Sequence, residues 1–261
     1  MQDPMTDNPM LENQELESQE QENQTPEAQA QENPEPIKKR TIRSFVVRGG
    51  RMTEGQQKNY DANWAFYGLE LTDGRIDYQT TFGRQSDVVI EVGFGMGASL
   101  VEMAKKAPEK DFIGIEVHPP GVAKLMMLAQ EEGLKNLRVY CDDAIEVMAS
   151  CLPEQAASAF QLFFPDPWHK KKHNKRRIVQ PLFAQQVANV LKEDGYFHMA
   201  TDWEPYAEHM LEVMEAQENY SNAAGKGNYH PRPEWRPLTK FEQRGERLGH
   251  GVWDLIYKKS L

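Results

Sequence analysis

The chain has 261 residues, and its 40 Asp and Glu against 30 Lys and Arg give a formal net charge of −10. Ten of the acids and none of the bases lie in residues 1–36, which leaves 30 of each in residues 37–261. The acidic total therefore excludes no class of partner, nucleic acid included. With 39% hydrophobic and 10% aromatic residues the chain can bury a core, which excludes a fully disordered protein.

Targeting signals and cysteine spacing narrow the class further. No apolar run approaches the roughly 20 residues that a membrane-spanning helix needs. The N-terminal residues have neither the basic nor the apolar part of a signal peptide. Cys141 and Cys151 form neither a disulfide framework nor a metal-binding pair by their spacing. We therefore expect a soluble, cytoplasmic protein with reduced thiols and no membrane contact.

Composition divides the chain into three parts. Residues 1–36 are rich in Gln, Glu, Asn and Pro and lack aromatic residues, so we expect a disordered tail. Residues 37–60 are expected to form a basic arm, because the stretch from Lys38 to Arg51 holds six Lys and Arg and no acid. Such a stretch is either a solvated surface or, with Phe45 interleaved, a contact for a phosphate backbone. Residues 61–261 are expected to form the main folded domain.

From Asp87 onward, short apolar runs that predict buried strands alternate with amphipathic stretches that predict helices. The expected strands are residues 87–92, 111–117, 137–141, 159–164, 196–201 and 251–259. The expected helices are residues 98–107, 122–133, 144–151, 179–195 and 203–217. Alternating β/α units with short connections predict an α/β fold, a doubly wound and mostly parallel sheet with right-handed crossovers.

The first expected strand runs into a glycine-rich turn that contains Glu91, Gly93, Gly95 and Gly97. The glycines allow a tight turn and let a ligand approach the start of the next helix. A nicotinamide-binding turn reads G-x-G-x-x-G, whereas here the third glycine comes one residue early. An acid also lies two residues before the first glycine. This pattern suits a ligand with a cationic amine and no pyrophosphate.

Acids also end the next two expected strands. Glu116 lies 23 residues after Gly93, where an acid typically accepts hydrogen bonds from ribose hydroxyls. Asp142 and Asp143 follow the third strand, where a carboxylate can accept from an adenine amino group, although Asp143 also fits a helix N-cap. Each acid alone has a structural explanation. Together with the glycines they indicate adenosine plus a cation, so the expected cofactor is S-adenosylmethionine.

The fourth expected strand is followed by Asp166 between two prolines, which restrict its backbone. Trp168 offers an aromatic plane on which a base can stack. The next nine residues hold six Lys and Arg, two His and no acid, which favours a phosphate partner over a solvated surface. His169 and His173 have metal-ligand spacing, but with cations around them and no Cys or acid we expect no metal there.

These segments, together with ATDW (200–203) and TKFE (239–242), resemble those of bacterial tRNA (guanine-N7)-methyltransferases. The resemblance extends over about residues 40–259 and includes RSFVVRGGRMTEGQQ (43–57). It implies a class I S-adenosylmethionine-dependent, Rossmann-like methyltransferase domain. It also implies methyl transfer to N7 of guanine 46 in the variable loop of tRNA, and we expect a monomer.

The resemblance assigns roles to individual residues. It implies cofactor contacts for Glu91, Gly93, Gly95, Gly97, Glu116, Asp143 and Asp166, of which Asp166 is also the catalytic position. It implies substrate contacts for Lys170, Asp202, Thr239, Lys240, Phe241 and Glu242. It implies RNA binding by Lys172, His173, Asn174, Lys175, Arg176 and Arg177. Thr239 and Glu242 also have the spacing of a helix capping box.

The expected chemistry needs no general base, because guanine N7 already presents a lone pair. Asp166 and Asp202 would stabilise the positive charge that develops on the purine and accept from guanine N1–H and the 2-amino group. Trp168 would support the extruded base. Three alternatives stay open: a methyltransferase for a small molecule or protein, a tRNA-binding module without turnover, and a nicotinamide dehydrogenase, which the glycine spacing disfavours.

Overall fold

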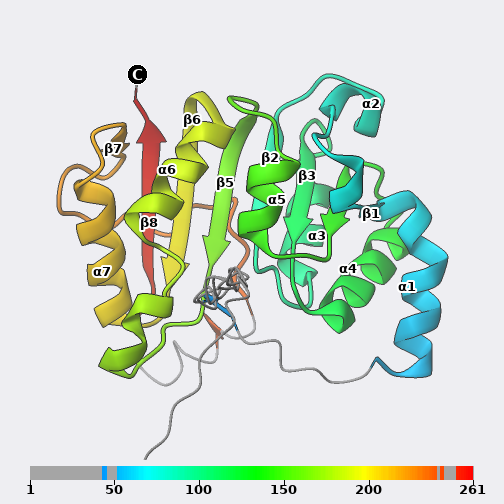
Figure 1. The fold of residues 1–261 in the computed structure, drawn as a ribbon, viewed down its shortest axis with the longest axis horizontal. Coiled ribbons are helices and arrows are strands. Elements are labelled where there is room, and N and C mark those ends of the chain that lie inside the picture. Colours follow the sequence, from blue (N-terminus) through cyan, green and yellow to red (C-terminus); the bar gives the residue numbers. More distant parts are fainter. Residues whose placement is uncertain (1–42, 46–51, 240–241, 244–250, 261) are drawn as a thin grey trace, which may run out of the picture. The chain divides into compact units, whose positions relative to one another are not determined.

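The computed structural model describes residues 43–45, 52–239, 242–243 and 251–260. Its centre is an eight-stranded sheet with the order β1-β4-β3-β2-β5-β6-β8-β7 (Figure 1). All strand pairs are parallel except those of β8, which runs antiparallel to both β6 and β7. The strands are β1 (Gly68–Leu69), β2 (Val88–Val92), β3 (Asp111–Ile115), β4 (Leu137–Tyr140), β5 (Ala157–Phe163), β6 (Leu191–Thr201), β7 (Tyr220–Asn222) and β8 (Trp253–Lys259).

Helices cover both faces of the sheet. The helices are α1 (Glu54–Tyr67), α2 (Tyr78–Phe82), α3 (Ala98–Lys106), α4 (Pro119–Glu131), α5 (Ala144–Ser150), α6 (Pro181–Val190) and α7 (Glu204–Glu215), with 3-10 turns η1 (Leu71–Asp73) and η2 (Lys171–Arg176). Apolar side chains of α5, α6 and α7 form one core with the sheet, and those of α1, α3 and α4 form a second core on its other face (Figure 1). Within the described ranges, no helix is long and apolar enough to cross a membrane.

The strand β2 shows why the apolar runs form buried strands. Val88, Ile90 and Val92 pack into one core, and Val89 packs into the other. Because successive side chains of a strand point to opposite faces, a strand covered on both faces needs apolar residues at nearly every position. Glu91 breaks this rule, since it is an acid at a buried position of the strand.

The order of the strands predicts where in the sheet a ligand binds. The chain moves from β2 through β3 to β4 on one side, and β5 and β6 continue on the other side. The direction of winding therefore reverses between β2 and β5, and ligands of such sheets bind there, outside the carboxyl ends of the strands.

The predicted α/β architecture is confirmed, and each expected strand and helix is present with shifted ends. The largest shifts share one boundary: the expected helix 179–195 ends at Val190 and the expected strand 196–201 begins at Leu191, because Leu191 already pairs with Ala157 of β5. The prediction missed α1, α2, β1 and β7. Residues 1–36, residues 37–42 and 46–51 of the expected basic arm, and Lys240 and Phe241 lie outside the described residues. The division at residues 60 and 61 stays a prediction, although α1 runs through it.

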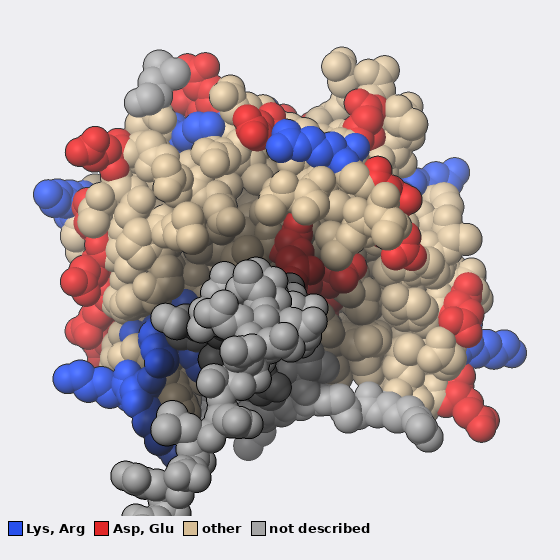
Figure 2. Space-filling view, viewed as in Figure 1, with Lys and Arg blue, Asp and Glu red and all other residues tan. Residues whose placement is uncertain are grey.

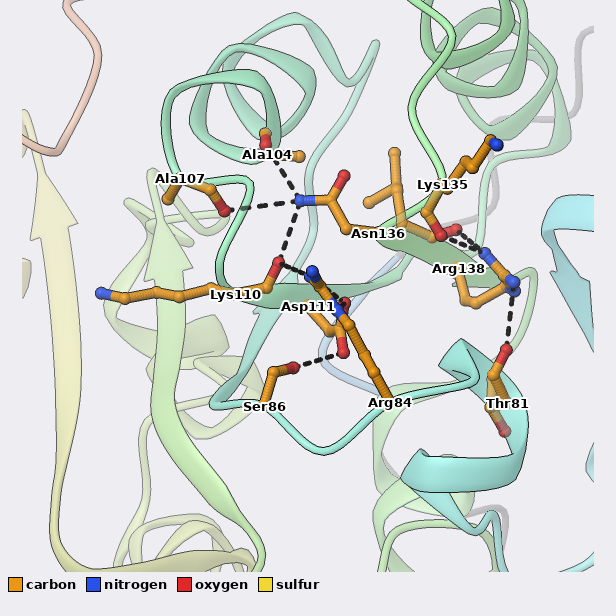
Figure 3. A network of polar contacts seen from close by, with 11 residues as sticks. Thr81, Arg84, Ser86, Ala104, Ala107, Lys110, Asp111, Lys135, Asn136 and Arg138 are labelled. Carbon is orange, nitrogen blue, oxygen red and sulfur yellow. Dashed lines mark hydrogen bonds and ion pairs between the residues drawn. The ribbon is translucent and has the colours of Figure 1, made fainter.

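A polar network holds the opposite end of the sheet, where β3 and β4 begin (Figure 3). Asn136 donates through Nδ2 to the backbone oxygens of Ala104 at 3.0 Å and Lys110 at 2.9 Å. Arg84 donates to Asp111 Oδ1 at 2.6 Å and to the Lys110 oxygen at 3.0 Å. These bonds join the start of two strands to the end of α3, far from the carboxyl ends at which ligands bind.

Candidate active site

The carboxyl ends of the central strands surround a cavity of about 380 Å³. Four acids line it, and they follow β3, β4 and β5. A volume of this size lies in the range of pockets that hold a nucleoside-sized ligand. The lining includes Glu116, Asp142, Asp143 and Asp166, the turn residue Gly93, and the apolar side chains of Val92, Ile115, Leu162, Phe163 and Phe164.

Glu91 is a buried acid beside this cavity. Glu91 is 3% exposed, and the next two residues, Val92 and Gly93, line the cavity. Burial, and then the nearby charge of Glu116, raise the pKa of Glu91 to about 8. Its Oε2 atom has no hydrogen-bond partner within the described part of the chain. A buried carboxylate without partners is costly, and a positively charged amine would offset that cost.

The glycine turn is formed by backbone conformations that side chains disfavour. Gly93, Gly95 and Gly97 have φ angles of 77°, 59° and 77°. Gly97 is also the N-cap of α3, where a Cβ atom would lie 2.5 Å from Cβ of Leu125. The third glycine is therefore required both for the turn and for the close packing of α3 on α4.

Glu116 and Asp143 already bind backbone groups around the cavity. Glu116 accepts from the N–H of Gly95 at 2.9 Å and from that of Val117 at 2.8 Å, so it fixes the glycine turn against the end of β3. Asp143 is the N-cap of α5 and accepts from the N–H of Ile145 at 3.0 Å. Each carboxylate oxygen can accept a further hydrogen bond. A helix cap and a ligand contact are therefore compatible at Asp143.

Asp166 is presented by a turn with unusual backbone geometry. Phe164 and Trp168, on either side of it, have φ angles of 51° and 48°. Left-handed conformations are uncommon outside glycine and cluster at functional sites. The N–H of Phe164 donates to the oxygen of Ala200 at 2.8 Å, which ties the turn to β6. The exposed carboxyl of Asp166 is thereby held at the cavity wall.

Asp202 and Lys170 lie near this edge but do not line the cavity. Asp202 follows Thr201, the last residue of β6, and is partly buried. Because β5 and β6 are parallel neighbours, the segments that carry Asp166 and Asp202 leave the sheet at the same edge. Lys170 is exposed and immediately precedes η2.

A short piece of the basic arm forms part of the cavity wall, which the sequence analysis did not predict. Ser44 and Phe45 line the cavity. Trp168 donates from Nε1 to the Ser44 oxygen at 3.0 Å, and Arg176 donates to the oxygens of Arg43 at 3.1 Å and Phe45 at 3.3 Å. Arg176 also covers one face of the Trp168 ring, 3.8 Å from its centre. Both side chains therefore hold the arm, and one face of the expected stacking platform is occupied.

We call residues Lys170 to Arg177 the basic loop. Some of its Lys and Arg side chains are exposed, and others bind the protein's own backbone. Figure 2 shows Lys and Arg side chains gathered at the lower left, where η2 lies, and acids in a recess near the centre. Arg177 is 5% exposed and donates to the oxygens of Pro167 at 3.0 Å and Pro205 at 3.1 Å. The buried position of Arg177 therefore does not support the predicted contact with RNA. The other predicted RNA contacts on η2 are exposed at Lys172 and Lys175 and partly buried at His173, Asn174 and Arg176.

The TKFE segment shows a second unpredicted arrangement. Thr239 accepts through Oγ1 from the N–H of Glu242 at 3.0 Å, as expected for a helix cap. The Glu242 carboxylate is buried and binds Arg236 Nη1 and Nη2, each at 2.7 Å. Arg236 was not singled out from the sequence, although its buried partner Asp254, an acid inside an apolar strand, was a visible signal.

Comparison with known proteins places these features in a family. A family model described as "Putative methyltransferase" matches residues 85–255. A tRNA (guanine-N(7)-)-methyltransferase of Saccharophagus degradans is 59% identical over 225 residues, which cover 86% of this chain and 98% of that protein. The chain belongs to the tRNA (guanine-N(7)-)-methyltransferase family. A second family member, from Aeromonas hydrophila, is 60% identical over 220 residues, covering 84% of this chain and 93% of that protein.

The solved structures support the same fold. The crystal structure of the 16S rRNA methyltransferase KamB superimposes with a TM-score of 0.51 at 17% identity, covering 82% of this chain and 99% of that one. The predicted family, the methyltransferase class and S-adenosylmethionine as methyl donor are therefore confirmed. The acid-lined cavity fits that cofactor, which carries an amine, a ribose and an adenine, and so does Glu91, whose buried Oε2 has no partner among the described residues. The roles of individual residues in this tRNA (guanine-N(7)-)-methyltransferase family member stay predictions.

Proposed function

We propose that this protein transfers the methyl group of S-adenosylmethionine to N7 of guanine in tRNA, at position 46 of the variable loop. The observation that carries the proposal is the cavity at the winding reversal of the sheet, with buried Glu91 beside it and the basic loop next to it. The position in tRNA follows from the family resemblance. A basic loop beside a cofactor cavity is expected when the substrate carries phosphates.

The acids around the cavity suit the parts of the cofactor. Glu91 would pair with the amine, since it is buried and has an unused oxygen. Glu116 and Asp143 would accept hydrogen bonds from the ribose and the adenine edge. When bound, S-adenosylmethionine supplies a methyl group on a positively charged sulfur. The protein's part is to hold both reactants in one geometry, because guanine N7 needs no deprotonation.

Asp166 and Asp202 would act on the guanine. Their negative charges would stabilise the positive charge that develops on the purine ring, and their oxygens would accept from N1–H and the 2-amino group. Adenine presents an acceptor at N1 and would be rejected. The extruded base needs an aromatic surface. Trp203 is exposed and lies edge-on to the ring of His169, with 4.4 Å between centroids, so it complements Trp168, one face of which Arg176 covers.

Exposed cations of the basic loop would bind the tRNA backbone, and Lys172 and Lys175 are the clearest candidates. We further propose that the protein acts as a cytoplasmic monomer. Residues 61–261 would supply the methyltransferase domain, residues 37–60 the basic arm and residues 1–36 a disordered tail. Since Ser44 and Phe45 line the cavity, the arm would contribute to the cofactor site as well as to RNA binding.

Methyl transfer to bulk tRNA tests the proposal. The protein is incubated with methyl-labelled S-adenosylmethionine and tRNA, and the labelled nucleotide is mapped after nuclease digestion. We expect label on N7 of guanine 46, and none in a matched transcript with adenine at that position. Label on another atom, or no label in tRNA, contradicts the proposal. A substrate affinity that is insensitive to salt would instead favour a small-molecule or protein substrate.

A further inference from the structure

The chain that leads into the TKFE segment packs on β6, where the Trp235 ring lies 6.2 Å from that of Tyr196 and 6.4 Å from that of His198 between centroids. Asp254 faces away from the core that Leu255 and Tyr257 share with α6 and α7. The backbone N–H of His230 donates to the backbone oxygen of Asp254 at 2.8 Å, so this segment is attached directly to β8. Arg236 follows in this segment and is 1% exposed. A fully buried arginine requires partners for its charge and its donors.

Arg236 forms a bidentate ion pair with each of two carboxylates. It donates from Nη1 and Nη2 to the two oxygens of Glu242, each at 2.7 Å. It donates from Nε and Nη2 to the two oxygens of Asp254, at 2.7 Å and 2.8 Å. Asp254 Oδ1 also lies 2.7 Å from His198 Nε2 on β6. The planar fork of a guanidinium matches two carboxylates in this way, and an ammonium group cannot reproduce it.

The partners of Arg236 lie in, or pair with, the three segments that carry the proposed substrate contacts. Glu242 lies in the TKFE segment itself. Asp254 pairs in register with Ala200, two residues before Asp202. The guanidinium also lies over the ring of Phe164, 5.6 Å from its centre, two residues before Asp166. One buried side chain thus links three segments that are far apart in the sequence.

We propose that Arg236 is a positioning residue that sets the guanine-binding side of the site, an inference that rests on the proposed function. It lines no part of the cavity, and it acts through Phe164, Asp254 and Glu242. Glu242 contributes by holding the TKFE segment on Arg236. Buried ion pairs are often replaceable by apolar groups without loss of stability, so the network need not serve stability, and we assign it a geometric role.

The test is Arg236→Lys, which keeps the charge but loses the fork. Because small misplacement of reacting groups is costly, we expect kcat for tRNA methylation to fall roughly 100-fold. The Kd for S-adenosylmethionine, measured by calorimetry, should stay at the wild-type value. The matched control is Arg84→Lys in the remote ion pair with Asp111, which should lower the thermal midpoint and leave kcat unchanged.

Two outcomes would overturn the inference. One is a wild-type kcat in Arg236→Lys, and the other is a loss of kcat that equals the loss of cofactor binding. If Arg236→Lys does not fold, Asp254→Asn decides, since Asp254 is 2% exposed inside β8 and cannot touch guanine. Wild-type kcat in that variant also contradicts the inference. A wild-type protein that methylates no tRNA would instead contradict the proposed function.

Discussion

The guanidinium of Arg176 lies 3.8 Å from the centre of the Trp168 ring, and both side chains bind the backbone of residues 43–45. A cation over an indole face is a favourable contact. Here the two side chains in that contact also donate hydrogen bonds to the same short segment of backbone. Since Ser44 and Phe45 line the cavity, the basic loop and the cavity wall form one connected unit. Trp168 and Arg176 therefore hold one wall of the cavity in place.

The first prediction concerns Arg176→Ala. Loss of its hydrogen bonds should release the arm from the cavity wall and weaken S-adenosylmethionine binding by about 1 kcal/mol, roughly 5-fold in Kd. The matched control is Lys175→Ala in the same loop, because Lys175 is exposed and should affect tRNA affinity alone. Calorimetry with the cofactor and filter binding with tRNA separate the two effects. An unchanged cofactor Kd in Arg176→Ala would show that the arm contributes nothing to the cofactor site.

The second prediction concerns Asp166→Asn. The substitution keeps the shape of the side chain and removes the negative charge that is expected to stabilise the methylated purine. Loss of one preorganised electrostatic partner should lower kcat about 100- to 1,000-fold. The affinity for tRNA should change little, because the exposed lysines of the basic loop are intact. Single-turnover methylation and tRNA binding are measured on the same preparation, and full activity would refute the catalytic assignment.

The third prediction follows from the raised pKa of Glu91. With that pKa at about 8, most molecules carry a neutral Glu91 at pH 7. Pairing with a cationic amine needs the carboxylate, so cofactor binding should release a proton. Affinity should therefore rise with pH between about 6 and 7.5, by up to tenfold per unit. In Glu91→Gln the affinity should be lower and lose this slope, as calorimetry in buffers of different ionisation enthalpy would reveal.

The same shift has a consequence for the ligand-free protein. Because the pKa of Glu91 is higher in the folded than in the unfolded protein, the folded protein binds the proton on the Glu91 carboxyl more tightly. The contribution of Glu91 is then most favourable below about pH 4.5 and is lost as the pH rises toward 8. Glu91→Gln should remove this loss, so its thermal midpoint should exceed that of the wild type near pH 8. Equal midpoints at that pH would contradict the burial of a proton-binding Glu91.

The position of several residues around the cavity could be predicted from the sequence because their signals are local. Gly93 to Gly97 form a turn within five residues, and Glu116 and Asp143 occur where short strands end. The missed features depend on contacts between distant residues. Arg176 meets Arg43 at a separation of 133 positions, and neither position is unusual in its own surroundings. A cation in a basic loop has no sequence mark that distinguishes an RNA contact from an internal one.

Two of the predicted contacts, whose roles stay predictions, have internal partners for their charges. Glu242 looked like a substrate contact, yet its carboxylate is enclosed by Arg236. Arg177 looked like an RNA contact, yet it supports the backbone of Pro167 and Pro205. In both cases a charged residue was expected to contact a ligand, whereas in the fold its charged group binds other residues of the protein. An acid inside an apolar strand, such as Asp254, is the sequence signal that such a network exists.

The last prediction separates stability from activity. Asn136→Ala removes donors to the backbone oxygens of Ala104 and Lys110, which join α3 to the start of β3 and β4. The Ala104 carbonyl would lose this donor, whereas the Lys110 carbonyl keeps its bond from Arg84, so the free energy of unfolding should fall by about 1 to 2 kcal/mol. The network lies at the amino ends of the strands (Figure 3), so kcat per folded molecule should not change. Urea unfolding measures the first quantity and single-turnover methylation the second. A loss of kcat at full folding would mean that the two ends of the sheet are coupled.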